Sequence, residues 1–173
     1  MRFLLIQAIG ILGTLLFFLS FQCKKNRNLF RVQFVAYLCY TAHLLCLGAV
    51  TGGVSYMLNT VRSFCLGGKF AFLKSRWMCA ILCVLQLATL LLTWDGWWSI
   101  LPVAANIAAT IGGYTHNARK IRIAGIFINS PLWIVYDIVV GSWAGIIDEV
   151  VSEASMLLSI YRYGWNNLNT TES

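Results

Sequence analysis

Long apolar stretches alternate with short polar segments along the whole chain. Seven such stretches occur, at residues 3–22, 30–49, 53–68, 77–94, 97–115, 123–143 and 146–163. A helix of about 20 mostly apolar residues crosses the hydrocarbon core of a bilayer and satisfies its own backbone hydrogen bonds there. The pattern therefore predicts an all-α membrane protein with about seven transmembrane helices. The third stretch is short for a full crossing, and a tilted or half-buried helix fits it equally well.

Composition excludes the main classes of soluble protein. Hydrophobic residues make up 59% of the 173 positions and charged residues 11%, with a mean hydropathy of +0.73, whereas soluble domains are roughly a quarter charged. Seven Trp, seven Tyr and ten Phe exclude a disordered chain. Seven spans leave no room for a soluble catalytic domain, and no catalytic motif occurs. We therefore expect a protein that is not an enzyme.

The sequence gives no reason to expect a metal, a cofactor or a nucleic-acid partner. Cys79 and Cys83 are one helical turn apart, but no His accompanies them on that helix, so small packing residues explain them better than a metal site. The net charge of +7 suits contact with the anionic headgroups of the lipid bilayer. The oligomeric state does not follow from the sequence.

The distribution of charge predicts the orientation in the membrane. Except for Arg2, the 13 basic residues lie at or near one side of the predicted spans, with Arg62 inside a span. The opposite loops carry acidic residues instead, which we place at Asp95, Asp148 and Glu149. The positive-inside rule then puts the N-terminus outside and the C-terminus in the cytoplasm.

A shift of 93 positions aligns the first three spans with the last three. Phe34 falls on Phe127, and a Gly in each second turn matches another, as with Gly48 and Gly141. This register predicts two parallel three-helix bundles, at 1–68 and 96–165, which a linker helix at 69–95 joins. A short polar tail follows at 166–173. Parallel repeats of this kind build some transporters.

The first half also carries family-like motifs: Gly10-x-x-Gly13, the sequence His-Leu-Leu-Cys-Leu-Gly-Ala at 43–49, and Asn59-x-x-Arg62. Over about residues 5–165 the chain resembles the bacterial YgjV family of inner-membrane proteins. It is more distantly similar to the MtN3-like group, which contains the SWEET sugar facilitators, PQ-loop transporters and PnuC-type transporters. The resemblance implies a multi-pass protein of the cell inner membrane with two three-helix bundles. The Pro-Gln dipeptide that ends the first helix of that group is Phe-Gln at 21–22 here.

Polar side chains at membrane depth are costly unless paired or wet, so they are the candidate functional residues. Asn59 and Arg62 share one face of the third span. The guanidinium of Arg62 either binds an anionic group or reaches toward lipid headgroups. His43, in the second span, is either a hydrogen-bonded packing residue or a proton relay.

In the second half, Trp133 and Asp137 lie one turn apart on the sixth span, and Glu153 lies on the seventh. The two carboxylates either hold a proton or cation, or pair with His43 and Arg62. If all six candidates, including Asn59, face one cavity, that cavity suits a small polar metabolite. Pro131 interrupts the sixth span, and it is either a hinge or a static kink.

Two functions remain open. The first is a small-solute transporter or facilitator, which works by alternating access as one bundle rocks against the other. The second is a membrane protein that does not transport, and binds a partner subunit or has a structural role. The first predicts a wet polar cavity between the bundles, whereas the second predicts that the polar residues pair off in a dry core.

Overall fold

The structure of the chain is a computed structural model that describes residues 2–166 and 168. These residues form helices, short turns and no strand, which confirms the all-α prediction. The predicted tail at 166–173 falls mostly outside the described residues. The helices are α1 (Arg2–Phe21), α2 (Asn26–Cys46), α3 (Val50–Gly67), α4 (Arg76–Leu92), α5 (Ile100–Tyr114), α6 (Ala118–Ala124), α7 (Ser130–Val140) and α8 (Trp143–Tyr163).

The sixth predicted span is one helix in three parts. A π-helical turn, Gly125–Asn129, joins α6 to α7 without a break in the helix. Pro131 follows as the second residue of α7, where it supplies no backbone N–H to the preceding turn. The irregularity that we expected from Pro131 therefore lies just before the proline, and it takes the form of a π-turn.

Two tight turns have the same backbone shape. The turn from α2 to α3 contains Gly48 with a φ of 80°, and the turn from α7 to α8 contains Gly141 with a φ of 70°. Only glycine adopts this left-handed region without steric cost, so each glycine ends one helix and allows the next to begin two residues later.

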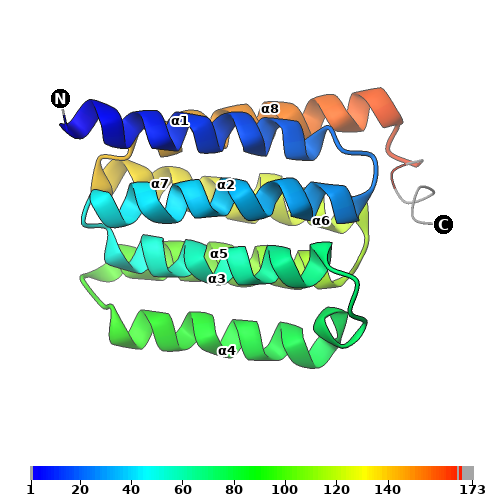
Figure 1. The fold of residues 1–173 in the computed structure, drawn as a ribbon, viewed down its shortest axis with the longest axis horizontal. Helices are drawn as coiled ribbons and strands as arrows, with labels where there is room; N and C mark the ends of the chain where they lie inside the picture. Colours follow the sequence, from blue (N-terminus) through cyan, green and yellow to red (C-terminus); the bar gives the residue numbers. More distant parts are fainter. Residues whose placement is uncertain (1, 167, 169–173) are drawn as a thin grey trace.

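Six helices form a closed ring, and α4 lies outside it. Neighbours in the ring are α1, α2, α3, α5, α7 and α8, in that order, with α8 packed against α1 again. In Figure 1, α1, α2 and α3 form one layer, in front of α8, α6–α7 and α5. Helix α4 packs on the seam between α3 and α5. The ring therefore has two inter-layer seams, α1–α8 and α3–α5.

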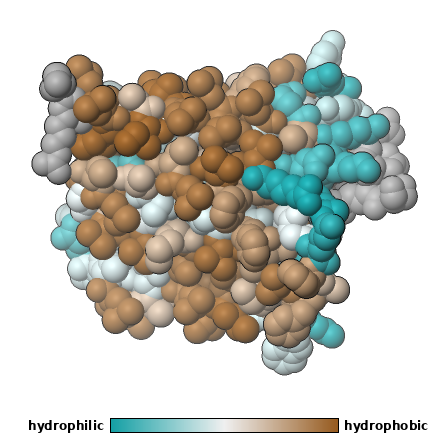
Figure 2. Space-filling model, in the orientation of Figure 1, coloured by the Kyte–Doolittle hydropathy of each residue, from teal (hydrophilic) through white to brown (hydrophobic). Residues whose placement is uncertain are grey.

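Compared with a soluble protein, the surface is more apolar and the interior is more polar. Leucines such as Leu4, Leu91 and Leu92 are more than 70% exposed, whereas Ser20, His43 and Asn106 have no exposed surface. Figure 2 shows apolar residues over most of one face and hydrophilic residues gathered at one end. By length and composition, Phe3–Phe21, Asn26–Cys46 and Ala118–Val140 can cross a membrane. A lipid environment explains an apolar surface around a polar interior.

Candidate functional site

His43 bridges the two layers near the α2–α3 turn. Its Nδ1 lies 2.9 Å from the carbonyl oxygen of Ile6, and its Nε2 lies 2.9 Å from Ser142 Oγ. A carbonyl can only accept, so a neutral His43 carries its proton on Nδ1 and accepts from the Ser142 hydroxyl at Nε2. Both ring nitrogens are therefore used, in a contact that joins α2 to the start of α8.

Asn59 and Trp133, which the sequence singled out separately, meet on the same atom. Asn59 Nδ2 donates to Asn106 Oδ1 over 2.7 Å, and Trp133 Nε1 donates to the same oxygen over 3.2 Å. The two donors fix the orientation of the Asn106 amide. Sequence reasoning missed Asn106, which is a lone amide within the otherwise apolar fifth span.

Arg62 is buried with most of its hydrogen-bonding capacity unused. Its Nη2 donates to the hydroxyl oxygen of Tyr37 over 2.7 Å, and the guanidinium carbon lies 5.3 Å from the centre of the Tyr37 ring. The Nε and Nη1 atoms have no hydrogen-bond partner among the described residues. The guanidinium of Arg62 therefore contacts Tyr37, and it forms no ion pair with a carboxylate of the described residues.

The remaining candidates are two carboxylates, of which Asp137 adjoins the His43 contact because its backbone carbonyl accepts from the Ser142 N–H. Asp137 is 2% exposed and packs against Gly145, where an added Cβ would overlap its carboxyl group. Glu153 is half-buried on α8. Within the described part of the chain, neither carboxylate forms an ion pair with His43 or Arg62. None of the six candidates lines either of the two cavities described below.

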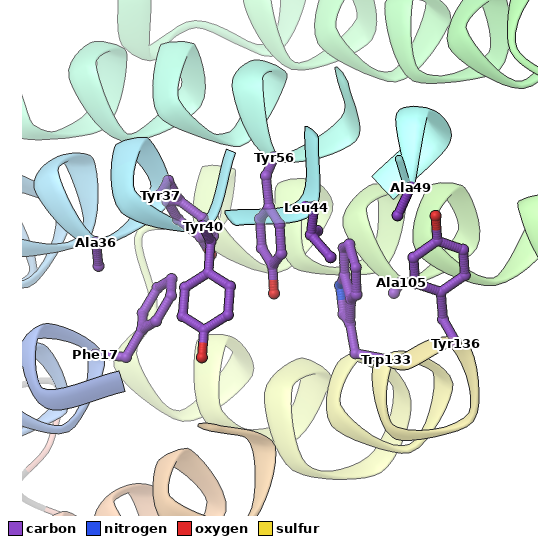
Figure 3. Close-up of a cluster of buried hydrophobic side chains, with 10 residues drawn as sticks. All are labelled: Phe17, Ala36, Tyr37, Tyr40, Leu44, Ala49, Tyr56, Ala105, Trp133 and Tyr136. Atoms are coloured by element: carbon purple, nitrogen blue, oxygen red, sulfur yellow. The ribbon is translucent and has the colours of Figure 1, made fainter. Parts of the chain in front are cut away.

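Aromatic rings line up through the middle of the ring of helices (Figure 3). Tyr56 of α3 stacks on Trp133 of α7, with ring centres 4.2 Å apart and planes 10° apart. Trp133 meets Tyr136 edge-on, with ring centres 5.5 Å apart. The Tyr136 hydroxyl accepts a hydrogen bond from the backbone N–H of Gly52, in the first turn of α3. We call Tyr56, Trp133 and Tyr136 the aromatic plug.

A small central cavity lies on one side of the plug. Its volume is about 40 Å³, room for one or two water molecules, and Tyr56 forms part of its wall. The other lining residues are Phe17, Phe21, Gln33, Tyr37, Gly125, Asn129, Ser130, Asp148, Glu149, Ser152 and Met156. Five helices (α1, α2, α3, α7 and α8) and the π-turn therefore converge on a void whose wall carries two carboxyl groups.

The positions of Asp148 and Glu149 correct the sequence prediction. We placed both in an outer loop, but α8 begins at Trp143, so they lie in its second turn and are 3% and 4% exposed. The loop assignment followed the acidic charge of the two residues, although the predicted run at 146–163 already included them. Ser142 caps the helix by accepting from the Gly145 N–H, so α8 begins three residues before that run and both carboxyl groups lie one turn deeper in the span. The shift of 93 positions indicates the correct start of α8, because it aligns Val50, the first residue of α3, with Trp143.

A larger cavity, which we call the vestibule, lies on the other side of the plug. Its volume is about 460 Å³, and Tyr136 contributes to its wall. It opens at the end of the molecule that carries the α2–α3 and α4–α5 turns, the left end in Figure 1. The remaining lining residues are Leu47, Gly48, Ala49, Val50, Thr51, Leu92, Thr93, Trp94, Asp95, Trp98, Val139 and Val140, of which Asp95 alone is charged.

The described residues contain no cluster of side chains that would bind a transition metal. In residues 2–166 and 168, no group of three or more His, Cys, Asp and Glu side chains is placed to hold a metal ion. Cys79 and Cys83 are both free and half-buried. The polar groups around the central cavity are carboxylate, hydroxyl and amide oxygens, which suit hard cations or water.

Comparison with known proteins identifies the chain. The sequence model of Imp-YgjV, described as a bacterial inner membrane protein, matches residues 4–167. The chain belongs to this family. Membership agrees with the apolar surface and makes this Imp-YgjV protein a bacterial inner membrane protein in contact with the lipid bilayer. No curated protein matches the chain. No solved structure matches it either.

Proposed function

We propose that this Imp-YgjV protein is a small-solute transporter or facilitator, without enzymatic activity, that works by alternating access between two three-helix bundles. The observation that carries the proposal is the position of the aromatic plug. It lies between a vestibule that is open at one end and a polar cavity in the middle of the helix ring. A transporter needs a closed barrier between an open compartment and a central site, and the plug fits that role.

Support for two equivalent bundles comes from the shift of 93 positions. Helix α2 begins at residue 26 and α6 at 118, while α3 begins at 50 and α8 at 143, so each boundary agrees to within one residue. The shift also relates the two left-handed glycines, Gly48 and Gly141. Parallel repeats related by an axis along the membrane normal are one known way to build a transporter.

Contacts across the layers are related in the same way. His43 corresponds to Tyr136, and each side chain reaches the first turn of the third helix in the opposite bundle. His43 binds Ser142, at the start of α8, and Tyr136 binds Gly52, at the start of α3. This exchange of contacts supports the proposed bundles at 1–68 and 96–165 and the distant similarity to the MtN3-like group.

We further propose that all seven helical segments cross the membrane, with the N-terminus outside and the C-terminus in the cytoplasm. The vestibule then opens to the periplasm. Support comes from the loops at its mouth, which contain Asp95 and no basic residue, whereas Lys24, Lys69 and Lys120 lie at the other end. The charge at the two ends follows the positive-inside rule.

The walls of the vestibule suggest the class of solute. Trp94 and Trp98 offer flat apolar faces, and Thr51, Thr93 and Asp95 offer hydrogen-bonding groups without a positive charge. Its volume falls within the usual range for small-molecule sites. A small polar solute, neutral or cationic, fits these walls better than an anion or a lipid.

A thermal-shift screen of the detergent-purified protein tests the proposal. Sugars, nucleosides, vitamin precursors and amino acids would be screened at equal concentration, because a ligand that binds only the folded state raises the melting temperature. We expect a hit that Asp95→Asn or Trp98→Ala removes and that exposed Trp77→Ala leaves unchanged. Uptake of the hit into proteoliposomes must follow. A hit without uptake, or no hit at all, would contradict the transporter proposal.

One observation favours the alternative, a membrane protein that does not transport and binds a partner or has a structural role. Asn59, Asn106 and Trp133 pair with one another, and His43 uses both ring nitrogens, as expected of residues that lock helices together. In that case Asn59→Ala destabilises the protein, and no solute of the panel raises the melting temperature of the unaltered protein. The transporter proposal predicts instead that a solute raises the melting temperature of the unaltered protein.

A further inference from the structure

We propose that the central cavity binds a dehydrated Na⁺ ion, which serves as the coupling ion of the transport cycle. The ion site itself depends only on the residues around the cavity. Its role as a coupling ion rests on the proposed transport function.

The first argument is charge. Asp148 and Glu149 line the cavity and are almost fully buried, and no basic side chain lines it. Asp137 packs against Gly145, one turn before Asp148 and Glu149 on α8. A buried charge at membrane depth is costly unless something compensates it. Arg62 does not line the cavity, and its Nη2 donates to the hydroxyl oxygen of Tyr37, which does. A cation in the cavity would offset part of this negative charge.

The second argument is an amide that points into the same void with nothing to bind. Gln33 of α2 is 4% exposed and lines the cavity, yet its side chain has no hydrogen bond to any described residue. A buried amide without a partner costs stability, so a ligand or ordered water must satisfy it. This observation is independent of the two carboxylates because it comes from the opposite layer.

The third argument is the type and number of ligand atoms. Besides the carboxylates and Gln33, the wall carries the amide of Asn129 and the hydroxyls of Ser130 and Ser152. Hard cations take several oxygen ligands of this mixed kind. The π-turn ends at Asn129, and Pro131 leaves a carbonyl of that turn without its usual donor. Irregular helical turns supply ion ligands in transporters of other folds.

The size of the cavity selects the ion. About 40 Å³ holds one small ion with at most one water, and excludes a hydrated ion or a metabolite. Two neighbouring buried carboxyl groups share one proton, which leaves a single negative charge for a monovalent cation. Magnesium gives up its own water shell reluctantly, so it fits a cavity of this size poorly.

The test is a titration of melting temperature with NaCl in purified protein, with choline chloride replacing NaCl at constant ionic strength. We expect a saturable rise with Na⁺ that choline and K⁺ do not produce. Glu149→Gln and Gln33→Leu should each raise the half-saturating NaCl concentration by about ten-fold or more, as loss of an ion ligand does. Glu153→Gln is the matched control, because Glu153 lies one turn further along α8 and does not line the cavity.

Folding of the variants is checked by a monodisperse elution profile and by the melting temperature in choline. Equal melting temperatures in Na⁺, K⁺ and choline would overturn the site, as would a response to Mg²⁺ or to acid alone. A response that Glu153→Gln removes and Glu149→Gln keeps would overturn it too. Solute uptake that does not depend on Na⁺ would overturn the coupling role. Na⁺ binding without any uptake would contradict the transport proposal, and the proposed ion site would still stand.

Discussion

Tyr56 and Trp133 stack face to face, with ring centres 4.2 Å apart, although they belong to different layers of the helix ring. Tyr56 also borders the central cavity, and Trp133 leads to Tyr136 at the wall of the vestibule. The stack is therefore one of the contacts between the two layers, and it lies between the two cavities.

Replacement of Trp133 by alanine should open this barrier. In a variant without native cysteines, Ser152→Cys places a thiol at the central cavity. We expect a small, water-soluble thiol reagent to label it much faster when Trp133→Ala is also present. Trp133→Phe keeps an aromatic ring and is the control. The Ala variant should also lose about 3–5 kcal/mol of unfolding free energy, as truncation of a buried Trp does. Equal labelling rates in all three proteins would show that Trp133 is no barrier.

Gly48 and Gly141 should tolerate substitution to the same small extent. Both have a positive φ, and a Cβ at either position would meet no atom within 4 Å. Alanine therefore costs only the strain of the left-handed backbone, about 1–2 kcal/mol at each site. Asn should cost less, since it adopts this conformation more readily. Melting temperatures in detergent check the prediction, and unequal losses at the two glycines would show that the two turns are not equivalent.

Gly52 and Gly145 should be less tolerant, because both pack against side chains of α7. A Cβ at Gly52 would lie 2.6 Å from a Tyr136 ring carbon, and one at Gly145 would overlap the Asp137 carboxyl group. Overpacking of this kind costs about 1–3 kcal/mol. Gly125→Ala is the matched control, since its Cβ would meet the end of the flexible Met156 side chain. A control that melts lower than both variants would contradict this account.

The His43 contact with Ser142 should appear as a coupling energy. In a double-mutant cycle with His43→Leu and Ser142→Ala, we expect the two losses to be non-additive by about 0.6–2 kcal/mol, the range for hydrogen bonds between membrane helices. The measurement is the unfolding free energy in mixed micelles. Tyr40→Phe with Ser142→Ala is the control cycle, because Tyr40 bonds to Thr14 and Ala144 instead. Additive losses for His43 would exclude a contribution from this contact.

The orientation can be measured by labelling from outside the cell. In a protein without native cysteines, Asp95→Cys should react with an impermeant maleimide in intact spheroplasts. Lys69→Cys should react only after the membrane is permeabilised. Both residues are exposed, so accessibility within the protein does not separate them. The reverse pattern would place the N-terminus in the cytoplasm.

The sequence predicts the helices well and the site only in part. Apolar runs locate helices because each span must be apolar on its lipid-facing side, and each of the seven runs coincides with a helical segment. Run boundaries are less informative, since capping by Ser142 extends α8 into residues that look like a loop. With the run starting at residue 146, Asp148 and Glu149 fell at the outer edge of the span and were counted with the loop. Trp133 and Asn59 were found because they are polar or bulky at membrane depth, but their common partner Asn106 depends on how α3, α5 and α7 pack.

Helix α4 makes the two seams of the ring unequal. It covers the outer side of the α3–α5 seam, where Gln86 donates to the Ser55 carbonyl and Thr51 donates to the Thr93 carbonyl. Among the described residues the α1–α8 seam has no covering helix, and direct hydrogen bonds hold it, such as those from the Gln22 amide to Ser155 and from the Ala144 N–H to Gln7. One edge of the ring is therefore closed by contacts between the layers themselves. The other edge is closed partly through α4, the same segment that links the first three helices to the last three along the chain.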